Sequence, residues 1–326
     1  MKTSKKIVEY LRNTGQVTGN ELIDYLGITD RAVRKQLKAL LDNDQVKRTG
    51  KPPRVYYSIA DKPISSEARD SSIINAAAKR IIEKEFLYIT PRGTIQEGTE
   101  GFIYWCNERS LDLAKTAERY KQTMLKYSNY KKAGLIDGMY KLKTSFDEVA
   151  LDKVFYIDFY SVEIFGKTKL GQLLLFAKQS QNRKLINELS DIIKPIVLRL
   201  IDKYEVDGVG FIPPTVRREL QLVKQLQSRL NLNVRTIPIF KVKTPIAVPQ
   251  KTLNKIEDRI INARETISVD DTRKYNNILL IDDAVGSGST LNETAKKIGQ
   301  RGLCKGKIIG LSITGSFKGF DVISEV

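Results

Sequence analysis

Residues 278–298 read ILLIDDAVGSGSTLNETAKKI, which is an apolar run followed by two acids, a loop of small residues and a helical pattern. The four apolar residues at 278–281 predict a strand that is buried on both faces. Asp282 and Asp283 stand at the carboxyl end of this strand, and a helix is expected to begin near Ser289 or Thr290. The loop glycines allow the backbone to approach an anion closely, and the free amides of the first helical turn would point at it. The stretch therefore predicts a phosphate site formed by Ala284, Val285, Gly286, Ser287, Gly288, Ser289 and Thr290.

The loop differs from two common nucleotide-binding motifs. Gly288 is followed by Ser289 and Thr290, so the lysine of a Walker loop is missing, and the spacing Gly-x-Gly-x-x-Gly is absent as well. These absences disfavour a nucleoside triphosphatase. The plainer alternative is an ordinary strand, an Asp-Asp turn and a capped helix that holds no ligand.

The same residues resemble the PRPP signature of type I phosphoribosyltransferases, which is an apolar strand, two acids and a small-residue loop that ends in Gly-x-Thr. The resemblance implies that Asp282 and Asp283 are the catalytic acids and hydrogen-bond the ribose 2′ and 3′ hydroxyls, while residues 284–290 hold the 5′-phosphate. It also implies Mg²⁺ as cofactor, bound through PRPP near the two acids and not by a ligand set of the chain's own. Adjacent residues in a strand face opposite sides, so we expect the turn after the strand to bring both carboxylates to one sugar.

From Val154 onward the sequence alternates between strand-like and helix-like segments. Strands are expected at 154–160, 207–212, 234–240, 277–281 and 307–313, with a further segment at 162–165 paired to the first. Residues 168–204 are mostly helical, and Pro195 predicts a break or a new helical start there. The alternation predicts an α/β fold, a parallel sheet with flanking helices that binds its ligand at the carboxyl ends of the strands. The resemblance implies a type I phosphoribosyltransferase fold for residues 141–326.

A tight loop follows the strand expected at 207–212 and leads into a helix. Arginines in its first turn and the free helix amides would suit an anion, although a surface role is about as plausible for Arg218. By the resemblance, this loop would bind pyrophosphate through Pro213, Pro214, Thr215 and Arg217.

A polar insertion spans residues 243–270, and such insertions are often plain loops. Its order of a threonine, then Gln250, Leu253, Arg259 and Asn262, resembles the hood region of the ComF branch of phosphoribosyltransferases, which is associated with DNA uptake and processing. The resemblance implies that Gln250 and Arg259 are hood residues over the active site, where lids are common.

Two departures from these families are visible. ComF proteins commonly begin with a zinc ribbon, whose cysteines this chain lacks. Hypoxanthine-type enzymes carry an acid inside the phosphate loop that acts on the purine, whereas this loop has only glycine and serine at 286–289. The acceptor of any transfer reaction is therefore open.

Residues 1–60 predict a compact unit of three helices and a β-hairpin. The third helix, which Thr29 would cap, has apolar residues at Val33, Leu37, Leu40 and Leu41 on one face. The unit contains twelve basic and six acidic residues. It resembles a winged helix-turn-helix of bacterial regulators, in which the third helix enters the major groove of double-stranded DNA. The alternative is a winged helix that is used for protein contacts. Arg31, Arg34 and Lys35 would reach base edges, Lys38 lies on the same helix face, and Lys47, Arg48, Lys51 and Arg54 would meet phosphates.

Composition and charge exclude several kinds of catalytic site and indicate the kind of partner. The formal net charge of +17 favours anionic partners, and the absence of histidine excludes Ser-His-Asp, Cys-His and His-ligated zinc mechanisms. No apolar segment is long enough for a membrane span or a signal core, so we expect a cytoplasmic protein that does not bind membranes. Residues 61–140 read as a polar linker and a mainly helical connecting subdomain with a strand at 102–106 and a helix at 110–127.

Three hypotheses follow. In the first, the chain is a DNA-binding regulator or effector that responds to PRPP or a related phosphorylated ribose, as in a purine repressor that joins a winged helix to a non-catalytic PRPP-binding domain. In the second, it is an active phosphoribosyltransferase tethered to nucleic acid. In the third, it is an anti-phage effector, since similar domain pairs accompany the reverse transcriptases of bacterial retrons. Thr290 and the acid pair predict ligand binding under all three and do not decide turnover. Paired winged helices usually imply a homodimer.

Overall fold

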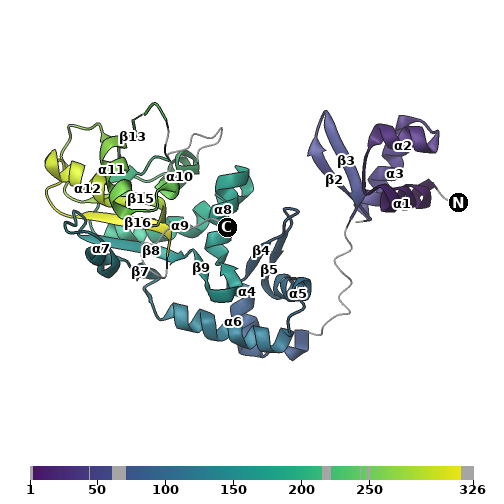
Figure 1. The fold of residues 1–326 in the computed structure, drawn as a ribbon, viewed down its shortest axis with the longest axis horizontal. Coiled ribbons are helices and arrows are strands. Elements are labelled where there is room, and N and C mark those ends of the chain that lie inside the picture. The colour runs from purple at the N-terminus through teal and green to yellow at the C-terminus, as the bar shows by residue number, and fades with distance from the viewer. Residues whose placement is uncertain are drawn as a thin grey trace. The chain divides into compact units, whose positions relative to one another are not determined.

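The computed structural model describes residues 3–43, 45–60, 71–214, 222–242, 244–246, 248 and 250–316. The chain divides into two compact units, Met1–Ser71 and Ser72–Val326, each with its own apolar core. Both are drawn in Figure 1, and each is described here by itself.

The first unit packs three helices against a small antiparallel sheet. Thr18 caps the second helix through a capping box with Glu21, and Gly27 ends it in the left-handed conformation. Thr29 stands at the cap position of the third helix but makes no side-chain cap bond. The sheet has the strand order β1-β3-β2. The elements are α1 (Thr3–Thr14), β1 (Gln16–Thr18), α2 (Gly19–Leu26), α3 (Asp30–Asp42), β2 (Val46–Lys51) and β3 (Arg54–Ile59).

The core of this unit follows the predicted helical spacing. Val33, Leu37 and Leu40 of α3 are buried against Ile7 and Leu22, whereas Leu41 is only half-buried. The third helix therefore has one apolar face, as predicted, and its opposite face is exposed.

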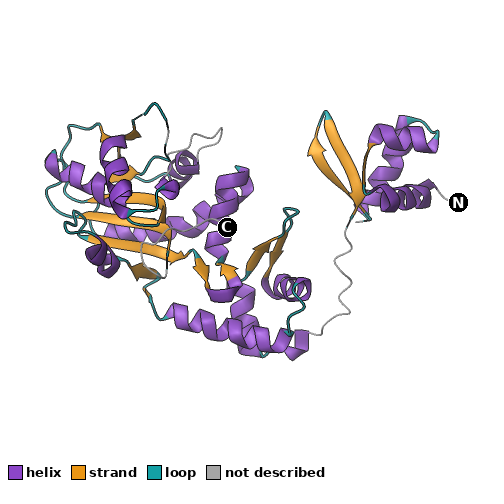
Figure 2. Ribbon diagram, in the orientation of Figure 1, coloured by secondary structure: helices purple, strands orange, loops and turns teal. Residues whose placement is uncertain are grey.

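The second unit is built on a seven-stranded sheet in the order β12-β11-β15-β16-β8-β7-β6. The five strands from β12 to β8 are parallel, and β7 and β6 continue the sheet in antiparallel pairing (Figure 2). The prediction of an α/β fold is confirmed, and the sheet, which was expected to be parallel, is parallel over the five strands from β12 to β8. The strands are β6 (Lys131–Lys132), β7 (Leu135–Asp137), β8 (Lys153–Phe159), β11 (Gly208–Phe211), β12 (Arg235–Ile237), β15 (Ile278–Val285) and β16 (Ile308–Gly315).

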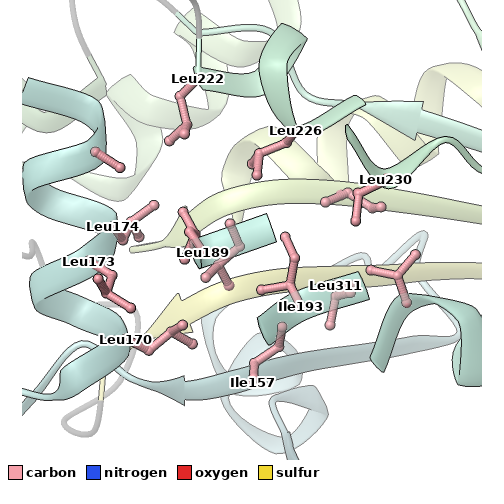
Figure 3. Close-up of a cluster of buried hydrophobic side chains, with 14 of the residues drawn as sticks. Ile157, Leu170, Leu173, Leu174, Leu189, Ile193, Leu222, Leu226, Leu230 and Leu311 are labelled. Atoms are coloured by element: carbon pink, nitrogen blue, oxygen red, sulfur yellow. The ribbon is translucent and has the colours of Figure 1, made fainter. Parts of the chain in front are cut away.

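Helices cover both faces of this sheet. On one face, α8 (Lys169–Ser180), α9 (Arg183–Lys203) and α10 (Leu222–Leu230) enclose a leucine-rich cluster with β8 and β16 (Figure 3). On the other face, α12 (Ser289–Gln300) and α7 (Met139–Ser145) pack with the partly buried apolar residues of α11 (Ile256–Thr266).

Pro195 does not break the helix, contrary to the sequence prediction. It lies inside α9, which runs uninterrupted from Arg183 to Lys203. Buried residues lie on both sides of it, at Leu189 and Ile193 before and Val197 after. A proline inside a helix costs about 3 kcal/mol. We infer that burial of this continuous apolar stripe outweighs that cost.

Residues 102–106 form a helix and not the expected strand. They lie in α5 (Gly98–Glu108), where Phe102, Trp105 and Cys106 are buried at the i, i+3, i+4 spacing of one helix face. Their core also contains Tyr120 and Phe165. The other elements of this region are η1 (Ser71–Ile73), α4 (Ala76–Glu85), β4 (Leu87–Ile89), β5 (Ile95–Glu97) and α6 (Leu113–Ser128).

Two further strand predictions are corrected. The strand expected at 234–240 is divided at Pro238 into β12, which joins the main sheet, and β13 (Ile239–Lys241), which pairs with β14 (Ile267–Val269). Proline cannot donate to a ladder, so the division falls there. The segment at 162–165 does not pair with β8. Instead β9 (Ser161–Val162) pairs with β10 (Gly166–Lys167) across the turn η2 (Glu163–Phe165).

No helix within the described ranges has the length and apolar character needed to cross a membrane.

Candidate functional site

The neighbouring strands β11 and β15 form a topological switch point. After β11 the chain passes through α10, on the leucine-rich face, to β12 on one side. After β15 it passes through α12, on the opposite face, to β16 on the other side. Open α/β sheets bind ligands outside the carboxyl ends of the strands where connections diverge in this way. The sequence-predicted residues at the ends of β11 and β15 therefore meet at the expected ligand position.

The two acids lie inside β15, because this strand continues to Val285. Pairing with β16 extends through Asp282, Ala284 and Val285, so the turn expected directly after the acids begins later. Asp283 Oδ2 lies 2.7 Å from Lys178 Nζ of α8. Asp282 precedes Asp283 in the strand, so the two side chains leave the strand on opposite faces. The positive charge of Lys241 in β13 interacts with the Asp282 carboxyl group.

Burial and neighbouring charges shift the pKa of the Asp282 carboxyl group. Burial first, and then the negative charge of Asp283, raises the pKa of Asp282 to about 7. The Asp283 amide donates to Asp282 Oδ1 at 2.8 Å, and Lys178 and Lys241 partly oppose the increase. Burial lowers the pKa of Lys241, while Asp282 acts in the opposite direction. The Asp282 carboxyl group therefore holds a proton more readily than an ordinary aspartate does.

The small-residue loop leads directly into the amino terminus of α12, as predicted. Gly288 adopts φ 80° at the cap position and provides no side-chain cap. Ser287 Oγ and Ser289 Oγ are 2.8 Å apart, and the Ser289 amide lies 3.3 Å from Ser287 Oγ. Both serines are buried. Loop glycines and a helix amino terminus without a side-chain cap are features of an anion site.

Arg259, one of the two predicted hood residues, lies close to this loop. Arg259 of α11 is only 5% exposed, and its Nε donates to the Leu253 carbonyl at 2.7 Å. Gln250 Nε2 donates to the backbone carbonyl of Arg259 at 3.0 Å. A Cβ placed on Gly286 would lie 3.3 Å from Arg259 Nη1. The fold therefore brings together a loop and an insertion that are separate in sequence.

Part of the expected pyrophosphate loop follows β11 at the same edge of the sheet. The Ile212 amide donates to the Ile281 carbonyl at 2.9 Å, which places Pro213 and Pro214 immediately beyond the pairing of β11 with β15. Thr215 and Arg217 lie outside the described residues.

The predicted DNA-contacting residues of the first unit are largely exposed. Arg34 forms a two-point ion pair with Asp30, with Nε–Oδ1 at 2.9 Å and Nη2–Oδ2 at 2.8 Å. In the β2–β3 hairpin, Lys47 is half-buried and the side chain of Lys51 is not described. The exposed residues of the set are Arg31, Arg34, Lys35, Lys38, Arg48 and Arg54.

A family model described as an HTH domain matches residues 3–45. The first unit contains a helix-turn-helix domain. The match covers α1 to α3 of this domain, together with β1.

Comparison with curated proteins finds no match. Among solved structures, the chain is similar to adenine phosphoribosyltransferase from Trypanosoma brucei in complex with AMP, pyrophosphate and ribose-5-phosphate. The two share 12% sequence identity, the match covers 53% of this chain and 85% of the other, and the TM-score is 0.27.

Sequence reasoning missed the two lysines beside the acid pair. Lys178 lies in α8 and Lys241 in β13, both well before β15 in the chain. Neither belongs to a local motif, so the sequence offers no signal for them apart from the general excess of basic residues. Their position beside the acids is a consequence of the tertiary fold.

Proposed function

We propose that this protein is a DNA-binding regulator or effector whose second unit binds PRPP, or a related phosphorylated ribose, together with Mg²⁺. One observation carries the proposal: an acid pair and a Gly-Ser loop that opens onto a helix amino terminus meet at the switch point of a parallel sheet.

Each end of such a ligand has suitable partners. The amides around Ser289 and Thr290, with the hydroxyls of the loop serines, are suited to a phosphate group. Asp282 and Asp283 supply acceptors for ribose hydroxyls. Because Lys178 already contacts Asp283, ligand binding at this carboxylate would rearrange the ion pair.

The donor set is consistent with Mg²⁺ that arrives with the ligand. Among the described residues, no group of three or more histidine, cysteine, aspartate or glutamate residues could hold a metal ion. Mg²⁺ is commonly bound through one or two carboxylates, substrate phosphates and waters, so Asp282 and Asp283 would be sufficient protein ligands. When bound, the ion would neutralise negative charge on the pyrophosphate group.

For the helix-turn-helix domain, we propose that α3 enters the major groove and that the β2–β3 hairpin acts as a wing. The exposed Arg31 and Lys35 would lie at the base edges, together with Arg34 once it leaves Asp30. Arg48 and Arg54 of the hairpin would contact phosphates. In a homodimer, two such domains would contact two half-sites of one duplex. The mass measured by light scattering, with and without duplex DNA, would test whether the protein is a dimer.

A second function, active phosphoribosyl transfer, is favoured by one observation. Asp282 and Asp283 lie in β15, one short loop before the amino terminus of α12, so both carboxyl groups would be close to a ribosyl group whose phosphate is bound at that loop. In that case the acid pair would also stabilise positive charge on the ribosyl group in the transition state.

Calorimetric titration with Mg²⁺-PRPP, combined with detection of released pyrophosphate against a panel of bases and nucleotides, tests both functions. Binding without release indicates a ligand-responsive DNA-binding protein, whereas acceptor-dependent release indicates an enzyme. The double variant Asp282→Asn with Asp283→Asn should lose PRPP binding and remain folded. Retained binding would refute the assigned site.

Duplex binding is tested separately with the double variant Arg34→Glu and Lys35→Glu. We expect this variant to lose affinity for duplex DNA and to bind PRPP as the wild type does. An unchanged DNA affinity would show that α3 is not the DNA-contacting helix.

A further inference from the structure

The insertion between β13 and β14 contains a concentration of buried polar atoms without partners. Among the described residues, four buried side-chain atoms make no hydrogen bond, and three of them are Gln250 Oε1, Arg259 Nη2 and Asn262 Oδ1. Buried polar groups are nearly always paired in folded proteins, so such a cluster indicates a missing partner.

Arg259 is the charged member of this cluster. Only 5% of Arg259 is exposed. No carboxylate among the described residues forms an ion pair with it. Burial lowers the pKa of its guanidinium, with no acidic group acting in the opposite direction. An isolated buried cation is costly, and a bound anion would remove this cost.

The guanidinium of Arg259 is held in a defined position. Its Nε donates to the Leu253 carbonyl, and Gln250 donates to the Arg259 carbonyl, so both ends of the residue are fixed within the insertion. Nη1 lies against Gly286, at 3.3 Å from the position of a Cβ on that glycine. The guanidinium group that carries the unpaired Nη2 thus lies beside the loop that precedes α12.

Two independent features therefore converge on one place. The cap residue of α12 is Gly288, which has no side chain to occupy the amides of the first turn, and the loop at 284–288 contains no basic residue of its own. Arg259 brings a buried, unpaired positive charge to the same loop from a different segment. A helix terminus alone would attract an anion weakly, whereas a guanidinium forms short, charge-assisted bonds with phosphate oxygens.

We propose that Arg259 is the cationic ligand of the phosphate group bound by residues 286–290, and that it makes the site selective for the dianionic form of a sugar phosphomonoester. This inference rests on the function proposed above. It assigns to Arg259 the contact that selects the dianionic phosphate. A phosphate bound in this way would connect α11 to the loop at 286–288. Gln250 Oε1 and Asn262 Oδ1 are hydrogen-bond acceptors, so they would pair with hydroxyl groups or water. Phosphate oxygens need a donor, and Arg259 supplies it.

The test compares the full-length wild type with Arg259→Gln in calorimetric titrations with ribose 5-phosphate and with Mg²⁺-PRPP. We expect Arg259→Gln to lose roughly 10- to 100-fold in affinity for both ligands, the range for one hydrogen bond to a charged group. Arg229→Gln is the matched control, because it removes an exposed arginine of α10 with the same change in charge. Its affinities should equal those of the wild type.

A second readout separates phosphate recognition from a merely structural role. The second pKa of a phosphomonoester is about 6, so wild-type affinity for ribose 5-phosphate should increase as the pH rises from 5 to 7. Arg259→Gln should show a smaller increase, because it no longer prefers the dianion. Equal affinity and an unchanged pH profile in Arg259→Gln, with binding intact in the wild type, would overturn this inference alone.

Two other outcomes are decisive. If the wild type binds neither ligand, the proposed function and this inference both fail. If Arg259→Gln does not fold, Gly286→Ala replaces it, since the added methyl group would push Nη1 back by a few tenths of an ångström while residue 259 remains an arginine. Weaker binding of ribose 5-phosphate by Gly286→Ala supports the proposal, and unchanged binding overturns it.

Discussion

Lys178 and Asp283 form an ion pair between α8 and β15, with 2.7 Å between Nζ and Oδ2 and side-chain exposures of 35% and 15%. This contact connects the helix layer on the leucine-rich face to the acid pair at the switch point. It also gives Asp283 a cationic partner within the protein, whereas Asp282 experiences burial and a neighbouring negative charge.

The first prediction concerns this pair. Lys178→Met should lower the free energy of unfolding by on the order of 1 kcal/mol, because the mostly buried Asp283 carboxylate loses its cationic partner. An ion pair between two exposed side chains would contribute less than this one. Urea unfolding at neutral pH measures the change. Lys184→Met is the control, since Lys184 is an exposed residue of α9. An equal loss in both variants would show that the ion pair is not the cause.

The second prediction concerns pH. The pKa of Asp282 is about 7 in the folded protein and would be about 3.9 in the unfolded chain. The folded state therefore binds the additional proton between these values, and the contribution of Asp282 to stability is lost as the pH rises through 7. Unfolding midpoints in urea at pH 5 and pH 8 should differ less in Asp282→Asn than in the wild type.

Asp270→Asn provides the comparison for that measurement, because Asp270 is exposed and outside β15. It should retain the wild-type pH dependence. A pH dependence in Asp282→Asn that equals the wild type would contradict the prediction, because asparagine has no carboxyl group that binds a proton.

The third prediction concerns the β2–β3 hairpin. If Arg54 contacts a DNA phosphate, Arg54→Ala should weaken binding to all duplex sequences similarly. It should also reduce the slope of log affinity against log salt by about 1. Fluorescence anisotropy over a salt series gives both quantities. Lys305→Ala makes the same charge change at an exposed residue of the second unit and should leave the slope unchanged.

The fourth prediction compares two helical glycines. A Cβ on Gly171 would lie 2.2 Å from the Tyr160 carbonyl oxygen, so Gly171→Ala must displace the start of α8 from Tyr160, the residue that follows β8. It should destabilise the protein by about 1 to 3 kcal/mol, as overpacking usually does. Gly299 of α12 has no atom within 4 Å of its Cβ position, so Gly299→Ala should stabilise by about 0.5 to 1 kcal/mol. Opposite signs in urea unfolding would confirm the difference, and equal signs would contradict it.

Several elements could be predicted because their signals are local. The helix that begins at Ser289 follows two glycines and a polar loop, and the core face of α3 follows its apolar spacing. The α/β class follows from alternation along the chain. In each case, a few neighbouring residues contain the information.

The incorrect predictions involve distant partners. The strand β15 continues past the acids because β16 supplies hydrogen-bonding partners through Gly315. Residues 102–106 have aromatic side chains that favour strands in isolation, but their burial against α4 and α6 selects a helix. The apolar run at 234–240 is shared between two sheets, since Pro238 cannot continue a ladder.

The sequence by itself determined the motif at 282–290, the basic helix-turn-helix residues and the alternation of strands and helices that gives the α/β class, since these depend on neighbouring residues. Only the tertiary structure placed Lys178 beside Asp283, the Arg259 guanidinium beside Gly286, and the ends of β11 and β15 side by side. Such contacts join segments that are far apart in the chain. Their positions follow from how the sheet and its helices pack, which no local pattern specifies.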